Sequence, residues 1–309
     1  MKLCMKFQPS RREFTVLVGA ALGTVTGGAM LASPALAETA NLITRAIPNS
    51  GELLPAVGLG TAQIFNTNDD TTRQKAAAVI AALIADGGRV IDTASSYGGA
   101  EGVIGDVLAA GNLRQKVFIA TKLEAPDQAE LKRSLARLKT DKVDLLFLHN
   151  VRDKDQSLAQ FKDWKKQGVC RTIGITSTFH GDYGAVEAVL QRERPDVVEI
   201  DYSIDDREAE KRILPLAAEV KAGVFTALPF GRGRLFRAVH GKELPDWARG
   251  FAASWAQFFL KYLISDPRVT TVIPGTADAA HMTDNLGAMR GPLPDPEERK
   301  RMVAFIEGL

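Results

Sequence analysis

Cysteine is scarce in this sequence, with only Cys4 and Cys170 among 309 residues. Cys4 lies in a leader that we expect to be removed, so the remaining chain cannot form an intramolecular disulfide. Histidine is also scarce, and the four residues are His149, His180, His240 and His281. No two of them have the spacing of a helical metal-binding pair. We therefore predict no metal centre and find little support for a metal-dependent hydrolase or lyase.

An excess of charge of one sign is also lacking, since the formal net charge is +2. Residues 1–37 contain four basic residues and one acidic residue, so the chain without them carries a formal charge of −1. This balance argues against nucleic acid or an anionic membrane surface as a partner.

The first 37 residues have the three parts of a secretory signal peptide. They begin with basic residues, continue with a weakly apolar run over 14–31, and end in Ala35-Leu36-Ala37. Ser10-Arg11-Arg12-Glu13-Phe14 matches the twin-arginine pattern. We expect transient contact with the twin-arginine export machinery, cleavage after Ala37 and a periplasmic location. One alternative is a retained anchor, although a run rich in Gly, Ala and Thr makes a poor spanning helix; another is a chance Arg-Arg pair in an ordinary leader.

Residues 38–309, about 270 residues, alternate short apolar runs with longer amphipathic segments. The runs are too apolar to have a wet face, which indicates parallel strands covered by helices. We expect strands at Val57–Gly60, Arg89–Asp92, Val117–Thr121, Val143–Leu148, Arg171–Ile175, Val197–Ile200, Val224–Ala227 and Val269–Ile273. We expect helices near 73–86, 101–110, 127–138, 155–167, 182–191, 207–221, 251–264, 278–288 and 295–307.

Eight strand-helix repeats predict one domain of the α/β class, a (β/α)8 TIM barrel, over residues 38–309. An open doubly wound sheet is disfavoured because no strand is followed by Gly-x-Gly-x-x-Gly and a helix. Leu53-Leu54-Pro55 predicts a short hairpin that caps the bottom of the barrel. Residues 231–245 lack a clean period and predict a long loop.

Polar side chains follow three neighbouring strands of the predicted barrel. Asp92 ends the second strand, Lys122 the third and His149 the fourth, and Tyr97 lies on the loop after Asp92. Active sites of such barrels collect at the carboxyl ends of the strands, so we expect these four residues to meet at one rim. Each residue alone has a structural explanation, such as helix capping by the Asp. Their convergence indicates a catalytic group.

This set has a chemical logic. A carbonyl that accepts hydride needs a proton on its oxygen, and a free tyrosine has a pKa of about 10. Lys122 beside Tyr97 is expected to lower the tyrosine pKa, and Asp92 to keep Lys122 charged and in place. His149 is a candidate for orienting the carbonyl oxygen or for sharing in the proton transfer.

The pattern resembles the aldo-keto reductases over nearly the whole chain after the leader. The matching segments are Leu54 to Thr61, Ile91 to Gly98 followed by Glu101 and Gly105, Asp144 to His149, and Val272 to Thr276. The resemblance implies a catalytic tetrad of Asp92, Tyr97, Lys122 and His149, with Tyr97 as the general acid. It also implies reduction of small aldehydes and ketones by NADP(H), less often by NAD(H), and a monomeric enzyme.

The resemblance assigns cofactor contacts to Gly60, Thr61, Ser177, Thr178, Glu199, Pro229, Phe230, Gly231, Arg232, Pro274, Gly275, Thr276, His281 and Asn285. Several depart from the family pattern. Thr178 stands where Asn is usual, Glu199 where Gln is usual, and Ala227 where an aromatic ring commonly stacks on the nicotinamide. His281 stands where Arg often binds the 2′-phosphate, and charge from Arg232, Arg234 or Lys242 is expected to compensate. The alternative function is a barrel that binds NADP as a sensor or partner subunit with little turnover.

Overall fold

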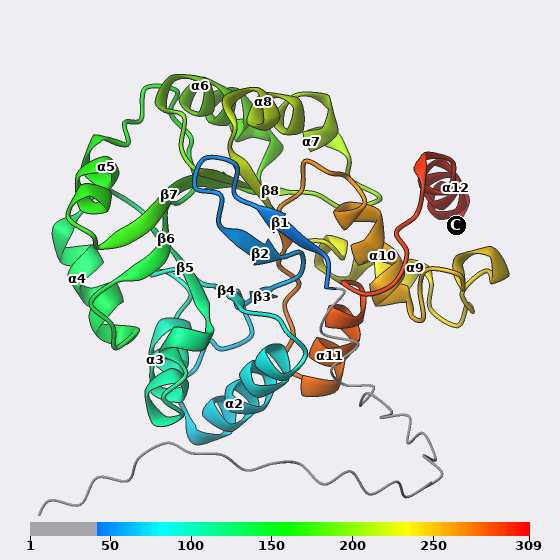
Figure 1. Cartoon of the computed structure of the whole chain (residues 1–309), viewed down its shortest axis with the longest axis horizontal. Helices are drawn as coiled ribbons and strands as arrows, with labels where there is room; N and C mark the ends of the chain where they lie inside the picture. The colour runs from blue at the N-terminus through cyan, green and yellow to red at the C-terminus, as the bar shows by residue number, and fades with distance from the viewer. Residues whose placement is uncertain (1–41) are drawn as a thin grey trace, which may run out of the picture.

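The computed structural model describes residues 42–309. It opens with an antiparallel hairpin of β1 (Thr44–Ala46) and β2 (Leu53–Pro55). The hairpin lies across the amino-terminal ends of the barrel strands (Figure 1), where Leu54 and Ile47 are fully buried. This confirms the predicted cap. The predicted leader, residues 1–37, lies outside the described residues.

Eight parallel strands follow one another around the molecule in sequence order. They are β3 (Leu59–Gly60), β4 (Val90–Asp92), β5 (Phe118–Leu123), β6 (Val143–Leu148), β7 (Cys170–Ser177), β8 (Val197–Asp201), β9 (Gly223–Ala227) and β10 (Thr271–Val272). Parallel bridges from Val57 to Val272 and from Gly60 to Gly275 join the first strand to the last. The sheet therefore closes, and the predicted barrel is confirmed over an open sheet.

Strand alternation divides the apolar residues into two cores. Side chains that point inward, among them Val90, Phe118, Phe147 and Phe225, form one cluster inside the barrel together with Leu54 of the cap. Their neighbours along each strand point outward against the helices. The barrel is thus a packed core, and only its rim is open to ligands.

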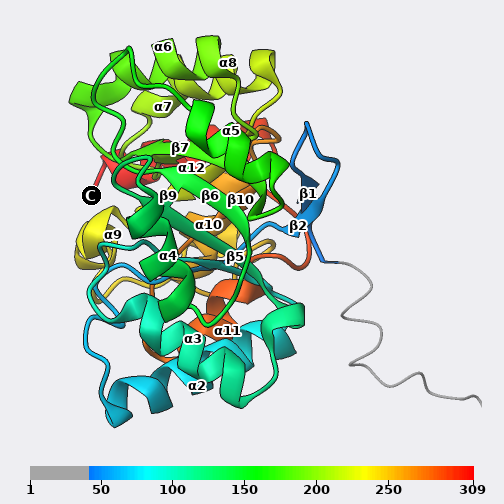
Figure 2. The ribbon, with the colours of Figure 1, turned by 90° about the vertical axis from the view of Figure 1, so that its left-hand side faces the viewer.

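Helices cover the outside of the barrel (Figures 1 and 2). They are α2 (Asp70–Ala85), α3 (Ala100–Ala110), α4 (Gln128–Arg137), α5 (Ala159–Lys166), α6 (Tyr183–Glu193), α7 (Glu208–Lys211), α8 (Ile213–Val220), α9 (Arg234–Ala238), α10 (Trp255–Ile264), α11 (Ala279–Gly287) and α12 (Pro296–Glu307). No helix in the part of the chain from 42 onward is both long and apolar enough to cross a membrane.

Several expected boundaries were wrong, and the helix expected over 155–167, for example, begins only at Ala159. The helix expected over 251–264 begins only at Trp255, because the Ser254 side chain accepts from Gln257 N and caps it there. The helix expected over 207–221 breaks into α7 and α8, since Pro215 cannot donate a backbone hydrogen bond to the last turn of α7. The loop expected over 231–245 contains the short helix α9.

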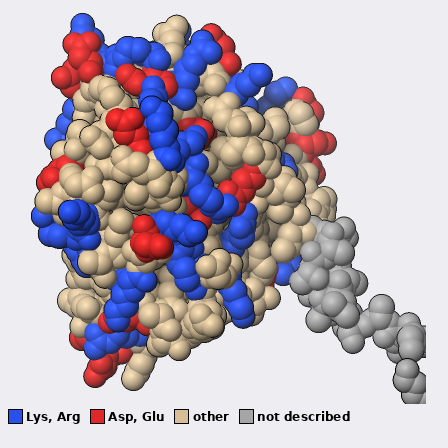
Figure 3. Space-filling view, turned by 60° about the vertical axis from the view of Figure 1, so that its left-hand side comes forward, with Lys and Arg blue, Asp and Glu red and all other residues tan. Residues whose placement is uncertain are grey.

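Basic and acidic side chains are interspersed on the face shown in Figure 3. Among the ion pairs of the described residues, Lys162 pairs with Glu193 and Lys165 with Asp196, each with an N···O distance of 2.7 Å. The charges of these side chains therefore largely offset each other.

Candidate active site

The four residues expected at the rim are brought together by the register of neighbouring strands. Asp92 pairs with Ala120 between β4 and β5, and Lys122 pairs with Phe147 between β5 and β6. His149 follows β6 directly, and Tyr97 lies on the loop that leaves β4. The structure therefore places all four side chains at the carboxyl end of the barrel.

Lys122 is completely buried beneath the rim. Its ammonium donates to Asp92 Oδ2 at 2.5 Å and to the Thr93 carbonyl at 3.1 Å. Glu199 Oε2 lies 3.2 Å from the same nitrogen, so two buried carboxylates flank one ammonium. Burial alone would lower the pKa of Lys122, but the charges of Asp92 and Glu199 outweigh burial and raise that pKa above its ordinary value.

Glu199 has a larger role than sequence reasoning gave it. We expected it only as a cofactor contact in place of Gln, yet its carboxylate belongs to the Lys122 pair. Burial, followed by the charge of Asp92, raises the pKa of Glu199 to about 8. Burial also raises the pKa of Asp92. At neutral pH, therefore, the Asp92–Glu199 pair retains a proton for much of the time.

Tyr97 is half-buried and packs edge-on against His149, with ring centres 5.8 Å apart. Lys122 Nζ lies 5.5 Å from the centre of the tyrosine ring. Burial raises the pKa of Tyr97 to about 12, and Lys122 offsets only part of this effect. The expectation of a lowered pKa was wrong in direction, because burial of the phenol outweighs the effect of the lysine charge, and the charges of Asp92 and Glu199 add to the effect of burial. At neutral pH the phenol keeps its proton, as a proton donor must.

His149 has a partner that we did not predict. Its Nδ1 lies 2.6 Å from Glu124 Oε1. Although burial opposes it, hydrogen bonds from Ser96 and His149 lower the pKa of Glu124. Burial, together with the charge of Lys122, lowers the pKa of His149. A neutral imidazole beside an ionised carboxylate carries its proton on Nδ1. Glu124 follows β5 directly, and this position at the carboxyl end of a strand is the sequence feature that could have identified it as a site residue.

Asp92, Tyr97, His149 and Glu199 line a cleft of about 820 Å³ at the open rim. The predicted residues that line it are Gly60, Thr61, Asp92, Tyr97, His149, Thr178, Glu199, Pro229, Phe230, Arg232 and Gly275. Residues that line it without having been predicted as site residues include Gln63, Asn66, Ser96, Asn150, Ala227 and Leu228. The cleft thus runs from the first strand to the last, which suits an extended ligand.

Other predicted residues lie outside this cleft. Ser177 is buried, and its hydroxyl donates to Asp182 Oδ2 at 2.7 Å, so it already has a partner within the protein. Gly231 lines a neighbouring hollow. Pro274, Thr276, His281 and Asn285 belong to the last strand-helix unit, where Asn285 is buried and His281 exposed.

Features of the cleft fit a dinucleotide. Asp92 Oδ1 and Thr93 Oγ1 are buried and have no hydrogen-bond partner among the described residues. In the loop after β9, Gly231, Arg232 and Gly233 all have positive φ, and the N–H groups of Gly231 and Gly233 donate to the carbonyls of Leu228 and Phe230, so the Arg232 side chain is the cationic group that this loop offers to a phosphate. A Cβ added to Gly60 would lie 2.7 Å from the Ile273 carbonyl, so only glycine permits the close approach of the first and last strands there.

The amino terminus of α11 is less open to a phosphate than the sequence indicated. The side chain of Asp278 accepts from the backbone N–H groups of Ala280 and His281. Its carboxylate therefore occupies the first amides of the helix and adds negative charge beside His281.

Comparisons with known proteins identify the family of this chain. The profile of the aldo/keto reductase family matches residues 56–306. The methylglyoxal reductase YeaE of Escherichia coli is 30% identical over 261 residues, covering 80% of this chain and 90% of that protein. An aldo-keto reductase of Mycobacterium avium is 32% identical over 271 residues, covering 84% and 89%.

Solved structures show the same likeness. An aldo-keto reductase of Klebsiella pneumoniae in complex with NADPH superimposes with a TM-score of 0.72 at 26% identity, covering 86% of this chain and 96% of that chain. A second Klebsiella pneumoniae structure, with NADP and acetate, gives a TM-score of 0.72 at 25% identity, covering 85% and 95%. The sequence match, the closed barrel and the buried Asp-Lys pair beneath Tyr97 lead to one conclusion: the chain belongs to the aldo/keto reductase family.

Proposed function

We propose that this protein reduces aldehydes and ketones with NADPH, with Tyr97 as the general acid. The observation that carries the proposal is the position of Tyr97, which lies in the cleft directly above a buried ammonium, 5.5 Å from the centre of its ring. The relatives bear reductase names, and the Klebsiella structure contains NADPH. A barrel that only bound the nucleotide would not require a buried Lys122–Asp92 pair at this point.

Side chains of the protein supply the proton that the carbonyl oxygen receives and stabilise the charge that is left behind. Bound NADPH supplies the hydride that becomes attached to the carbonyl carbon. Tyr97 donates its phenolic proton to the carbonyl oxygen, which yields the alcohol and leaves a phenolate. The ammonium of Lys122, held by Asp92 and Glu199, stabilises that phenolate. His149 lies against Tyr97 and helps to orient the carbonyl.

Replacement of Tyr97 by Phe tests this assignment. We expect Tyr97→Phe to reduce turnover by about 100-fold or more, because a positioned general acid is removed. The Kd for NADPH should change little, since only one hydroxyl is lost. Turnover is followed as loss of NADPH absorbance with a panel of aldehydes and quinones. Tyr262→Phe is the matched control, because the Tyr262 hydroxyl donates to Glu210, whose carboxylate does not line the cleft.

Two results would contradict the proposal. Undiminished turnover in Tyr97→Phe would remove Tyr97 from the mechanism. Tight NADPH binding by the wild-type protein, with no turnover across the panel, would favour the sensor or partner subunit instead.

We infer that NADPH is preferred over NADH, by a smaller margin than in relatives with Arg at the position of His281. A neutral imidazole offers a 2′-phosphate less than a guanidinium, and the Asp278 carboxylate lies beside it. Arg234 is engaged by Asp205 at 2.5 Å, which leaves Arg232 as the better compensating charge. Fluorescence titrations at fixed salt measure both affinities, and equal or tighter NADH binding contradicts the inference.

We also propose that the protein is a monomer exported through the twin-arginine pathway and trimmed after Ala37. The support is the Ser10–Phe14 pattern and the small residues before the cleavage point. Replacement of both Arg11 and Arg12 by Lys should retain the full-length protein in the cytoplasm. Normal export of that double variant would favour the general secretory route. Size-exclusion chromatography tests the monomer.

A further inference from the structure

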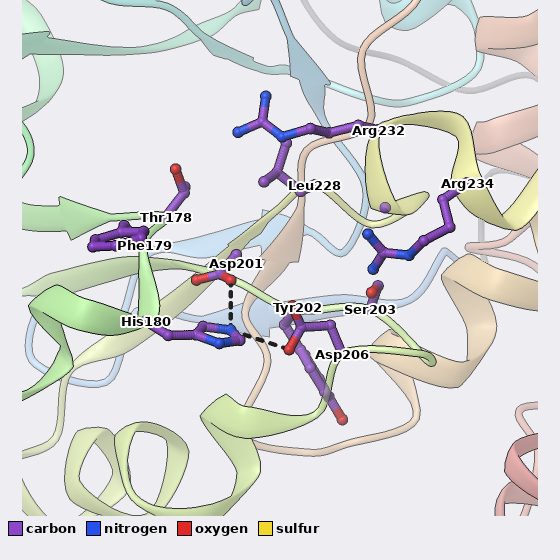
Figure 4. Close-up of a pocket in the computed structure, with 11 residues that line it drawn as sticks. Thr178, Phe179, His180, Asp201, Tyr202, Ser203, Asp206, Leu228, Arg232 and Arg234 are labelled. Carbon is purple, nitrogen blue, oxygen red and sulfur yellow. Dashed lines mark ion pairs between the residues drawn. The ribbon is translucent and has the colours of Figure 1, made fainter. Parts of the chain in front are cut away.

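A second hollow lies beside the cofactor cleft. It has a volume of about 230 Å³ and shares Thr178, Leu228 and Arg232 with the cleft. Its walls come from the loops that follow β7, β8 and β9 (Figure 4). The catalytic side chains Tyr97, Lys122 and His149 do not line it, although Thr178, Gly231 and Arg232, which we expect to contact the cofactor, form part of its wall.

Three side chains with metal-binding atoms meet in the hollow. His180 comes from the short 3₁₀ turn after β7, Asp201 is the last residue of β8, and Asp206 follows shortly before α7. His180 Nε2 lies 3.1 Å from Asp201 Oδ2 and 3.1 Å from Asp206 Oδ1. One atom from each residue therefore lies within 4.8 Å of the other two.

The imidazole of His180 faces both carboxylates. The Asp201 side chain is 8% exposed, and the Tyr183 hydroxyl donates to its Oδ1 at 3.0 Å. Its Oδ2 is directed toward His180 (Figure 4). One ring nitrogen and two carboxylate oxygens therefore converge on one point of the hollow, and these are atom types that bind transition-metal ions.

The cluster is also preorganised. Tyr183 fixes the orientation of Asp201. The backbone of Asp206 is held by two hydrogen bonds to Ser203, each 3.1 Å long. A divalent ion would not have to order these groups, so little entropy would be lost on binding.

Neighbouring basic side chains leave the cluster open to a cation. Of the two arginines that line the hollow, Arg234 is paired with Asp205, and Arg232 points away from the cluster (Figure 4). Among the described residues, His180 is the only ion-pair partner of Asp201 and Asp206. No arginine or lysine therefore competes with a cation for these two carboxylates.

We propose that His180, Asp201 and Asp206 bind one divalent transition-metal ion, with Zn²⁺ as the best match. Ligand atoms about 2.1 Å from a metal lie about 3.0 Å apart at adjacent octahedral positions and about 3.4 Å apart at tetrahedral positions. The two 3.1 Å separations fit between these values. Imidazole with two carboxylates suits Zn²⁺, whereas Mg²⁺ and Ca²⁺ prefer oxygen ligands alone.

This site departs from the sequence prediction of no metal centre. That prediction considered helical spacing of histidines, whereas these ligands come from two successive strand-helix loops. The bound ion would hold the loop after β7 against the loop after β8. Thr178 and Arg232 line both the hollow and the cofactor cleft, so the ion would also stabilise the edge of that cleft. Its role is structural, because it lies outside the group around Tyr97.

The test is calorimetric titration of chelator-treated, tag-free protein with ZnCl₂. We expect one site in the wild-type protein and at least tenfold weaker binding in His180→Gln and in Asp206→Asn. His240→Gln is the matched control, because it removes an exposed histidine outside the hollow and should bind as the wild type does. Mg²⁺ at the same concentrations should bind far more weakly.

A second measurement separates lost ligands from lost folding. Co²⁺ should give a visible absorption band in the wild-type protein that disappears in His180→Gln, while the far-ultraviolet circular dichroism of the two proteins is the same. The proposal is overturned if Zn²⁺ does not bind, or if both ligand variants bind it as tightly as His240→Gln does.

Discussion

Glu199→Gln is the most informative single change, because it keeps the shape of the side chain and removes its titration. Glu199 and Asp92 share one ammonium, and the side chains of Lys122 and Glu199 are 0% and 3% exposed. Glutamine retains a polar group beside Lys122 but leaves the ammonium with a single carboxylate. Comparison of the variant with the wild type therefore measures how much the second buried carboxylate costs in stability, while Lys122 keeps its ion pair with Asp92.

The size of the effect follows from the raised pKa of Glu199, which burial brings to about 8. At pH values between the ordinary pKa of a glutamate and about 8, Glu199 holds a proton in the folded state that it has released in the unfolded state. The free energy of unfolding of the wild-type protein therefore falls as pH rises through this interval. The loss from this group is about 1 kcal/mol at pH 5, about 3 kcal/mol at pH 7 and about 5 kcal/mol at pH 9. Glu199→Gln removes that loss, so its advantage over the wild type should grow by about 4 kcal/mol from pH 5 to pH 9.

Urea denaturation followed by circular dichroism at pH 5, 7 and 9 measures this advantage. Groups that do not contact position 199 titrate alike in both proteins, so the difference between them reports on Glu199 together with Asp92 and Lys122. Glu243→Gln is the control, because the Glu243 side chain is 91% exposed and its replacement should change stability equally at all three pH values. A difference between Glu199→Gln and wild type that stays constant with pH would refute the reasoning.

Three further predictions concern other parts of the barrel. Gly105→Ala should destabilise the protein by about 2 kcal/mol or more, because its Cβ would lie 2.1 Å from a carbonyl oxygen at the end of α4. Gly184 also lies within a helix but has open space around it, so Gly184→Ala should be neutral or stabilising by up to about 1 kcal/mol. Equal urea midpoints for the two variants would contradict the packing argument. Glu124→Gln should lower the pKa of His149, measured by NMR titration of the imidazole, and reduce turnover about tenfold, because the amide no longer fixes the Nδ1 proton; an unchanged titration would show that Glu124 does not act on His149. Burial raises the pKa of the Cys170 thiol to about 12. In a chain whose other cysteine is replaced by serine, Ellman's reagent at pH 8 should therefore label Cys170 only after unfolding. Rapid labelling of the folded protein would mean that the thiol is accessible.

The barrel was predictable because its signals are local and repeated. Each strand is a short apolar run that can be read without knowing its partners, and eight of them in succession favour closure. The boundaries that failed depend on single residues. The Ser254 cap shortened one helix and Pro215 divided another, and neither effect is visible in hydrophobic periodicity.

The candidate site was predictable in composition but not in electrostatics. Asp92, Lys122 and His149 end neighbouring strands, so their meeting follows from the fold. The pKa of Tyr97 does not, because it depends on how far packing removes the ring from water and on the second carboxylate beside Lys122. Glu199 was underestimated and Glu124 was overlooked for the same reason, since each acts through a contact between side chains of different strands rather than through a sequence motif.

The hairpin that plugs the barrel also determines how the protein can be attached to a surface. β1 and β2 lie on the opposite side of the barrel from α9 and the cleft loops (Figure 2), and Leu42 lies two residues before β1. A linker joined at this end would hold the barrel by its closed base. The cleft would then face the solution, so an enzyme immobilised on a bead or electrode through residue 42 should keep the substrate access of the free protein, whereas attachment through α9 should obstruct it.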